Sequence, residues 1–111
     1  MPYNEDLANR VRDEISSVRN VEEKKMMGGL TFMVNRKMCI GVLNDMLMLR
    51  IDPEEYEEAL KRKGCKKMDF TGQPMKGFVF VTTEGMRSKK DFSYWVGLAL
   101  SFNKSAKASR K

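Results

Sequence analysis

Residues 24–51 constrain the fold of this chain more than any other stretch, because three short apolar runs are separated there by two polar breaks. The breaks are Asn35-Arg36-Lys37 and Asn44-Asp45. Short apolar runs bounded by such residues are typical of antiparallel strands joined by tight turns. Asn44-Asp45 suits a two-residue hairpin loop, because Asn and Asp tolerate positive φ better than most residues. This loop pairs Leu43 with Met46 and fixes the register of the hairpin.

The hairpin register sorts the side chains by face, since successive side chains of a strand point to opposite sides of a sheet. One face is wholly apolar and is predicted to be the core: Met38, Ile40, Val42, Leu47, Leu49 and Ile51. The other face is mixed: Cys39, Gly41, Leu43, Met46, Met48 and Arg50. For the turn at Asn35 we prefer a three-residue loop, which adds Leu30, Phe32 and Val34 to the core. A two-residue loop at Asn35-Arg36 would add Thr31 and Met33 instead.

The predicted elements around these strands complete an α+β domain. An N-terminal helix begins after its cap Asn4 and ends near Arg19, and residues 21–25 are expected to connect it to the first strand. The later elements are a helix from Asp52 to about Lys63, strands at residues 68–70 and 75–82, and a helix capped by Asp91 that ends near Asn103. The order is αβββαββα, an antiparallel sheet with helices packed on it. We expect this domain to span residues 1–103, with a disordered basic tail at 104–111.

The composition indicates a soluble globular protein of one domain. The chain has 111 residues, of which 41% are hydrophobic and 32% charged. No run approaches the roughly 18 apolar residues that a membrane span needs, and the polar N-terminus does not resemble a secretory signal. Cys39 and Cys65 form no close-spaced motif, so reduced thiols in a cytoplasmic protein are expected.

The chain contains no histidine, which excludes His-based acid–base catalysis, Ser-His-Asp and Cys-His nucleophiles, and His-containing zinc sites. Gly28-Gly29 is followed by neither GK[ST] nor a helix, so a phosphate loop is disfavoured. We therefore expect no enzyme, no cofactor and no metal. An alternative enzymatic site would lie between Asp69 and Lys76, although a carboxylate there commonly bonds the backbone of its own turn.

Charge is distributed unevenly along the chain. Residues 1–60 hold 8 Lys/Arg and 12 Asp/Glu, whereas residues 61–111 hold 13 Lys/Arg and 3 Asp/Glu. One interpretation is a solvated surface that segregates its charges. The other is weak, sequence-tolerant binding of nucleic acid through the basic half. The candidate residues are Lys61, Arg62, Lys63, Lys66, Lys67, Arg87, Lys89 and Lys90.

Three motifs in order resemble the N-terminal domain of the TfoX/Sxy family: KKMMGGLTFMVNRKMCIGVL (24–43), LMLRIDPEEYEEAL (47–60) and MDFTGQPMKGFVFV (68–81). The resemblance implies a two-layer α/β domain with an antiparallel sheet and a secretion-chaperone-like topology. It also implies a non-enzymatic regulator of competence and DNA transformation that acts on transcription through a protein partner, either the transcription machinery or a separate regulator such as the cyclic-AMP receptor protein. The full-length regulators carry a C-terminal helical domain, so a stand-alone domain is expected here. Met27 stands where the family often has Phe.

The mixed face of the sheet is the predicted protein contact. A two-layer domain covers one face of its sheet and leaves the other to solvent or a partner. Methionine is favoured at adaptable contact surfaces, and exposed apolar patches mark interaction sites. We expect a contact through Cys39, Leu43, Met46 and Met48, with Arg50 at the margin, most simply in a twofold homodimer. The alternative is that the helices divide over both faces and bury these residues.

Overall fold

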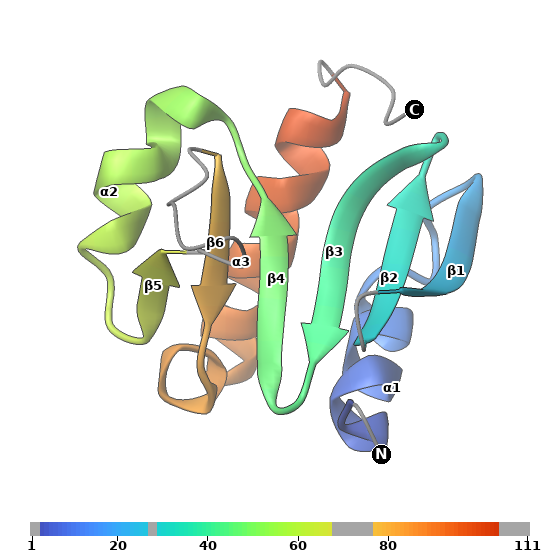
Figure 1. Cartoon of the computed structure of the whole chain (residues 1–111), viewed down its shortest axis with the longest axis horizontal. Helices are drawn as coiled ribbons and strands as arrows, with labels where there is room; N and C mark the ends of the chain where they lie inside the picture. The colour runs from blue at the N-terminus through green and yellow to red at the C-terminus, as the bar shows by residue number, and fades with distance from the viewer. Residues whose placement is uncertain (1–2, 27–28, 68–76, 105–111) are drawn as a thin grey trace.

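A computed structural model describes residues 3–26, 29–67 and 77–104, which form three helices and six strands (Figure 1). The helices are α1 (Glu5–Glu14), α2 (Tyr56–Leu60) and α3 (Lys89–Asn103), and two short 3₁₀ turns are η1 (Pro53–Glu55) and η2 (Thr83–Met86). The strands are β1 (Val21–Met26), β2 (Gly29–Val34), β3 (Lys37–Leu43), β4 (Met46–Arg50), β5 (Cys65–Lys67) and β6 (Phe78–Val81). Several expectations lie outside the described residues: Met27, Gly28, the strand at 68–70, the Asp69–Lys76 site and the tail beyond Lys104.

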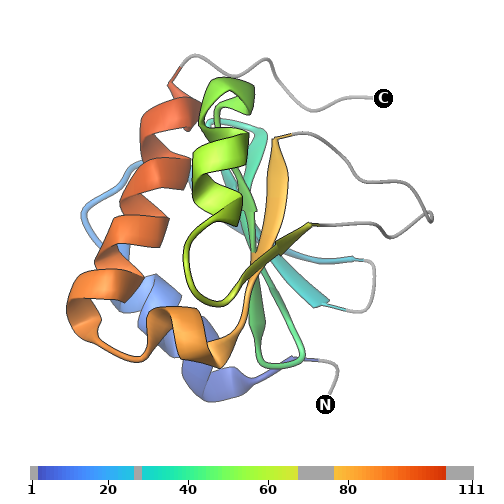
Figure 2. The ribbon, with the colours of Figure 1, turned by 90° about the vertical axis from the view of Figure 1, so that its left-hand side faces the viewer.

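The six strands form one antiparallel sheet in the order β1-β2-β3-β4-β6-β5. Figure 2 shows α1, α2 and α3 together on one side of this sheet. The predicted α+β class, with helices packed on an antiparallel sheet, is therefore confirmed. The order of elements along the chain differs from the predicted αβββαββα. The segment expected to connect α1 to the first strand is itself the strand β1, and a short strand, β5, follows α2 directly.

Strand β1 was missed because its sequence, VEEKKM, lacks the apolar alternation of a buried strand. It is an edge strand, and residues 22–25 are exposed. Such charged side chains are common on edge strands, where only one side is hydrogen-bonded. Arg12 of α1 donates two hydrogen bonds to the Glu23 carboxylate, at 2.8 Å each, and so joins the first helix to this edge.

The β3–β4 hairpin has the predicted two-residue loop. Leu43 pairs with Met46 and Ile40 pairs with Leu49, as the Asn44-Asp45 register requires. Asn44 has a φ of 53°, the left-handed conformation that Asn tolerates.

The β2–β3 turn differs from the prediction. Val34 pairs with Lys37, so the loop has two residues, Asn35 and Arg36, with φ values of 54° and 66°. Positive φ at both loop residues is the signature of a type I′ hairpin turn. The three-residue loop that we preferred is wrong.

A β-bulge reconciles this turn with the predicted core. The register shifts between Phe32 and Met33: Phe32 pairs with Ile40, whereas Met33 pairs with Met38, which leaves Cys39 as the extra residue of β3. Leu30, Phe32 and Val34 therefore still lie in the core, as expected.

The bulge exchanges the faces of two neighbouring residues of β3. Cys39, predicted on the mixed face, is 1% exposed and packs in the main core. Met38, predicted in the core, packs with Met48 and Phe80 on the opposite face. Both assignments fail for the same reason: strict alternation cannot include an inserted residue.

The core lies between the sheet and the helices. Asn4 caps α1 by accepting a hydrogen bond from Leu7 N at 3.0 Å, as predicted. The third helix starts earlier than expected, since Ser88 rather than Asp91 is its cap and accepts from Asp91 N at 3.0 Å. Trp95 is almost completely buried, and its indole N–H donates to Gly85 O at 3.0 Å.

Replacing Gly97 by alanine should stabilise the protein by about 0.5–1 kcal/mol, because glycine in a helix interior loses more backbone entropy than alanine on folding. A Cβ at this exposed position of α3 meets no atom within 4 Å. Urea unfolding measures the change. Gly64→Ala is the matched opposite case: its φ is +81° and the new Cβ would lie 2.4 Å from Gly85 N, so stability should fall. A Gly97→Ala protein no more stable than wild type would contradict this account.

Candidate functional site

The face of the sheet opposite the helices carries a second apolar cluster, separate from the main core. Met48 and Phe80 are 5% and 7% exposed at its centre. Half-buried side chains surround them, and we call the whole set the methionine face: Met38, Leu43, Met46, Met48, Phe78 and Phe80. In Figure 2 the three helices described all lie on the other side of the sheet. This cluster is therefore an apolar surface that those helices do not bury.

The structure brings together most of the predicted contact residues. Leu43, Met46 and Met48 lie in the cluster, and Arg50 lies at its margin, where its guanidinium carbon is 5.9 Å from the centre of the Phe78 ring. Cys39 is absent from this face because of the bulge.

Three members of the methionine face were missed by sequence reasoning. Phe78 and Phe80 join it because β6 pairs with β4, which sets Phe80 beside Met48 and Phe78 beside Arg50. Met38 joins it through the bulge. The alternation of side chains along β6 separates its two faces. Only the pairing of β6 with β4 determines which residues lie beside Phe78 and Phe80.

Cations flank this apolar face at both edges of the sheet. Directly paired residues share a face. One row across the sheet therefore contains Lys24, Thr31, Gly41, Met48, Phe80 and Lys66, in that order. Lys24 on β1 and Lys66 on β5 are both exposed. The same pairing rule places one exposed acid on this face, Glu22, which pairs with Met33 beside Met38. With Arg50 at one end, the rim of the apolar centre is therefore mainly basic.

The eight predicted nucleic-acid residues divide into paired and unpaired cations. Lys61 pairs with Glu58 at 3.3 Å, and Lys89 lies 3.8 Å from Glu14. Within the described ranges, the other six have no carboxylate oxygen inside 4.0 Å: Arg62, Lys63, Lys66, Lys67, Arg87 and Lys90.

These six cations do not form a single patch. Arg62 lies with its guanidinium 4.0 Å from the centre of the Tyr94 ring on α3. Arg87 lines a hollow on another side together with Asp6 and Asp45. Lys66 belongs to the rim of the methionine face. The basic half of the sequence therefore spreads over several surfaces.

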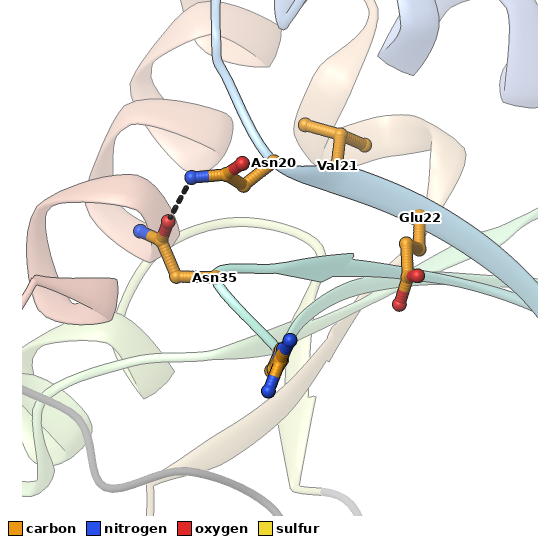
Figure 3. Close-up of a pocket in the computed structure, with 5 residues that line it drawn as sticks. Asn20, Val21, Glu22 and Asn35 are labelled. Atoms are coloured by element: carbon orange, nitrogen blue, oxygen red, sulfur yellow. Dashed lines mark hydrogen bonds between the residues drawn. The ribbon is translucent and has the colours of Figure 1, made fainter.

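A hollow of about 540 Å³ lies beside the β2–β3 turn and is lined by Asn20, Val21, Glu22, Asn35 and Arg36 (Figure 3). Asn20 Nδ2 donates to Asn35 Oδ1 at 3.1 Å, and Asn35 N donates to Asn20 O at 3.0 Å. Asn35 also approaches Asn103 of α3, with Nδ2 3.4 Å from Oδ1. These amides hold the turn against neighbouring backbone, so we assign them a structural role.

The cysteines are poorly suited to nucleophilic chemistry. Burial raises the pKa of Cys39 to about 12, against the smaller opposing effect of the Arg50 charge, and burial raises the pKa of Cys65 to about 11. Both thiols are protonated at neutral pH, and the thiolate is the reactive and metal-binding form. Among the residues described, no group of three His, Cys, Asp or Glu side chains could hold a metal ion. No helix in these ranges is long and apolar enough to cross a membrane.

The Cys39 thiol should make stability fall with rising alkaline pH. Its pKa is about 12 in the folded chain and ordinarily 9.0, so deprotonation favours the unfolded chain. The contribution is complete below pH 9 and is lost as pH rises toward 12, with a slope of up to about 1.4 kcal/mol per pH unit. Urea unfolding between neutral and alkaline pH should give a shallower decline for Cys39→Ala than for wild type. Parallel pH profiles for the two proteins would contradict the prediction.

Comparison with known proteins identifies a family. The family model of the TfoX N-terminal domain matches residues 13–103, from within α1 to the end of α3. A search of the curated proteins found no match, and neither did a search of the solved structures.

Proposed function

This chain belongs to the TfoX N-terminal domain family, and we propose that it is a regulatory module that binds a protein partner through the methionine face and catalyses no reaction of its own. Family membership supports a domain like those of competence-related regulators. The proposal adds the contact surface and a role in transcription through a partner such as the cyclic-AMP receptor protein.

The observation that carries the proposal is the apolar cluster on the side of the sheet away from the helices. Four of its six side chains are half-buried, so association would remove further apolar surface from water. Three of the six are methionines, whose flexible thioethers adapt to the shape of a partner. Both cysteines are held protonated by burial, which agrees with a binding role rather than catalysis.

The basic rim indicates the chemistry of the partner. Lys24, Lys66 and Arg50 surround the apolar centre, so a complementary surface has apolar side chains flanked by acidic ones. A second copy, docked face to face about a twofold axis that runs along the strands near Met48, would bring Lys24 near Lys66 of the other copy, because these lysines lie three and two strands from Met48 on opposite sides. Like charges facing each other across an interface are unfavourable. The charge pattern therefore favours an acidic protein segment over the homodimer.

Met46→Glu is the sharpest test of this surface, because Met46 is half-buried at the end of the hairpin and a carboxylate there would be repelled by an acidic partner. Titration calorimetry with purified cyclic-AMP receptor protein should show binding by wild type. The variant should bind about tenfold more weakly or worse, equivalent to ~1.4 kcal/mol. Tyr94→Glu is the matched control, since it places the same charge on α3, away from this face.

Two outcomes would overturn parts of the proposal. If Met46→Glu and Tyr94→Glu bind equally well, the methionine face is not the contact; if wild type does not bind, the cyclic-AMP receptor protein is not the partner.

Light scattering addresses the homodimer, and we expect a monomer at all concentrations. A dimer dissociated by Met46→Glu would make a second copy the occupant. Met48→Glu is less informative, because Met48 is only 5% exposed and the charge would destabilise the fold.

A further inference from the structure

We propose that the surface around Arg62 and Tyr94 binds single-stranded nucleic acid, with a base stacked on Tyr94 and phosphates bound by Arg62, Lys63 and Lys90. Arg62 lies between α2 and β5, and Tyr94 lies on α3. This surface is on the helical side of the protein, apart from the methionine face (Figure 2). It is therefore independent of the protein contact proposed above.

The aromatic ring is held in place and accessible. Tyr94 is 38% exposed and is the one large hydrophobic side chain that is exposed in the described ranges. Trp95 supports it edge to face, with ring centres 5.2 Å apart and an interplanar angle of 73°. On the next turn of α3, Gly97 has no side chain, and a Cβ there would meet nothing within 4 Å. The surface at Gly97 is therefore uncovered, and because Arg62 lies over one face of the ring, the proposal places the base on the other face.

Arg62 completes a platform that suits a nucleotide. Its guanidinium lies 4.0 Å from the centre of the Tyr94 ring and 5.7 Å from that of Trp95. No carboxylate of the described chain lies within 4.0 Å of it, and its side chain donates no hydrogen bond to a described residue. A guanidinium that lies over an aromatic ring can still use its N–H donors to bind a phosphate.

Two further cations lie near this pair. Lys90 precedes Tyr94 by four residues, which places the two side chains on the same face of α3. Lys63 follows Arg62, and its carbonyl oxygen would lie 2.6 Å from a Cβ at Gly85, just before α3. One acidic residue, Asp91, lies in the same turn of the helix as Lys90. The local balance of Arg62, Lys63, Lys90 and Asp91 is positive.

An exposed ring with cations favours a single strand over a duplex. The bases of a duplex are stacked on each other and cannot reach a side-chain ring, whereas a single strand presents its bases. Stacking on an aromatic residue is tolerant of sequence, and no helix among the described elements is arranged with α3 for reading a groove. An acidic peptide would satisfy the cations but leave Tyr94 without a role.

Fluorescence anisotropy with a labelled oligothymidine of about 15 nucleotides tests the proposal. Wild type should bind at about 50 mM salt, more tightly than it binds a duplex of the same length, and more weakly at about 150 mM. Tyr94→Leu should lower the affinity about tenfold without changing the salt dependence, whereas Tyr94→Phe should bind as wild type does. Circular dichroism confirms that the variants are folded.

The cations are tested with a pair of variants that lose equal charge. Arg62→Gln/Lys90→Gln should lower the affinity about tenfold and reduce the slope of log K against log salt by about 1.4. Lys24→Gln/Lys25→Gln removes two exposed cations from β1, at the opposite edge of the sheet from β5, and should change neither quantity.

Each of four results in these measurements would overturn the proposal, and a competition experiment gives a fifth. They are no binding at low salt, equal losses from the two charge pairs, wild-type affinity in Tyr94→Leu, and duplex binding as tight as that of the single strand. Polyglutamate, an acidic polypeptide, serves as a competitor that tests whether the surface binds protein instead. If it displaces the strand and its own binding also depends on Tyr94, the surface binds acidic protein and not nucleic acid.

Discussion

The bulge at Cys39 is the constraint on which both faces of the sheet depend. The type I′ turn at Asn35-Arg36 leaves no spare residue between β2 and β3, so without an insertion the core residues of the two strands could not face the same side. The inserted Cys39 restores the match and allows Phe32 and Ile40 to pack together under the helices. The same insertion turns Met38 outward and completes the methionine face, so one local irregularity shapes the core and the proposed contact.

Local signals in the sequence predicted the parts of the fold that depend on near neighbours. The Asn44-Asp45 hairpin and the Asn4 cap each follow from residues a few positions apart. Strand β1 could not be predicted in this way, because an edge strand is defined by its partner and its exposed side chains are charged. The bulge was also beyond local reasoning, since an extra residue becomes visible only when both strands are aligned.

The same distinction applies to the functional surfaces. Leu43, Met46, Met48 and Arg50 were identified because they belong to one hairpin whose register the sequence fixes. Phe80 and the Arg62–Tyr94 stack were not, because each contact joins segments that are distant in the sequence: β4 with β6, and the loop after α2 with α3. Charge counting identified Arg62 but gave no reason to separate it from Lys61, whose charge is already paired with Glu58.

The edges of the sheet distinguish basic residues whose charge protects an edge strand from basic residues that lie elsewhere. Both edge strands expose charges, Glu22 to Lys25 on β1 and Lys66 and Lys67 on β5, and charged edges hinder the addition of another strand. Edge protection is a sufficient explanation for Lys25 and Lys67, which pair with the core residues Leu30 and Val79, whereas Lys24 and Lys66 also belong to the rim of the methionine face. A partner is therefore directed to the face of the sheet rather than to its edge. Arg62 and Lys90 lie on no sheet edge, and in the described chain neither has a carboxylate oxygen within 4.0 Å. Arg62 and Lys90, the two cations without such an explanation, therefore belong to the surface that carries the exposed ring of Tyr94.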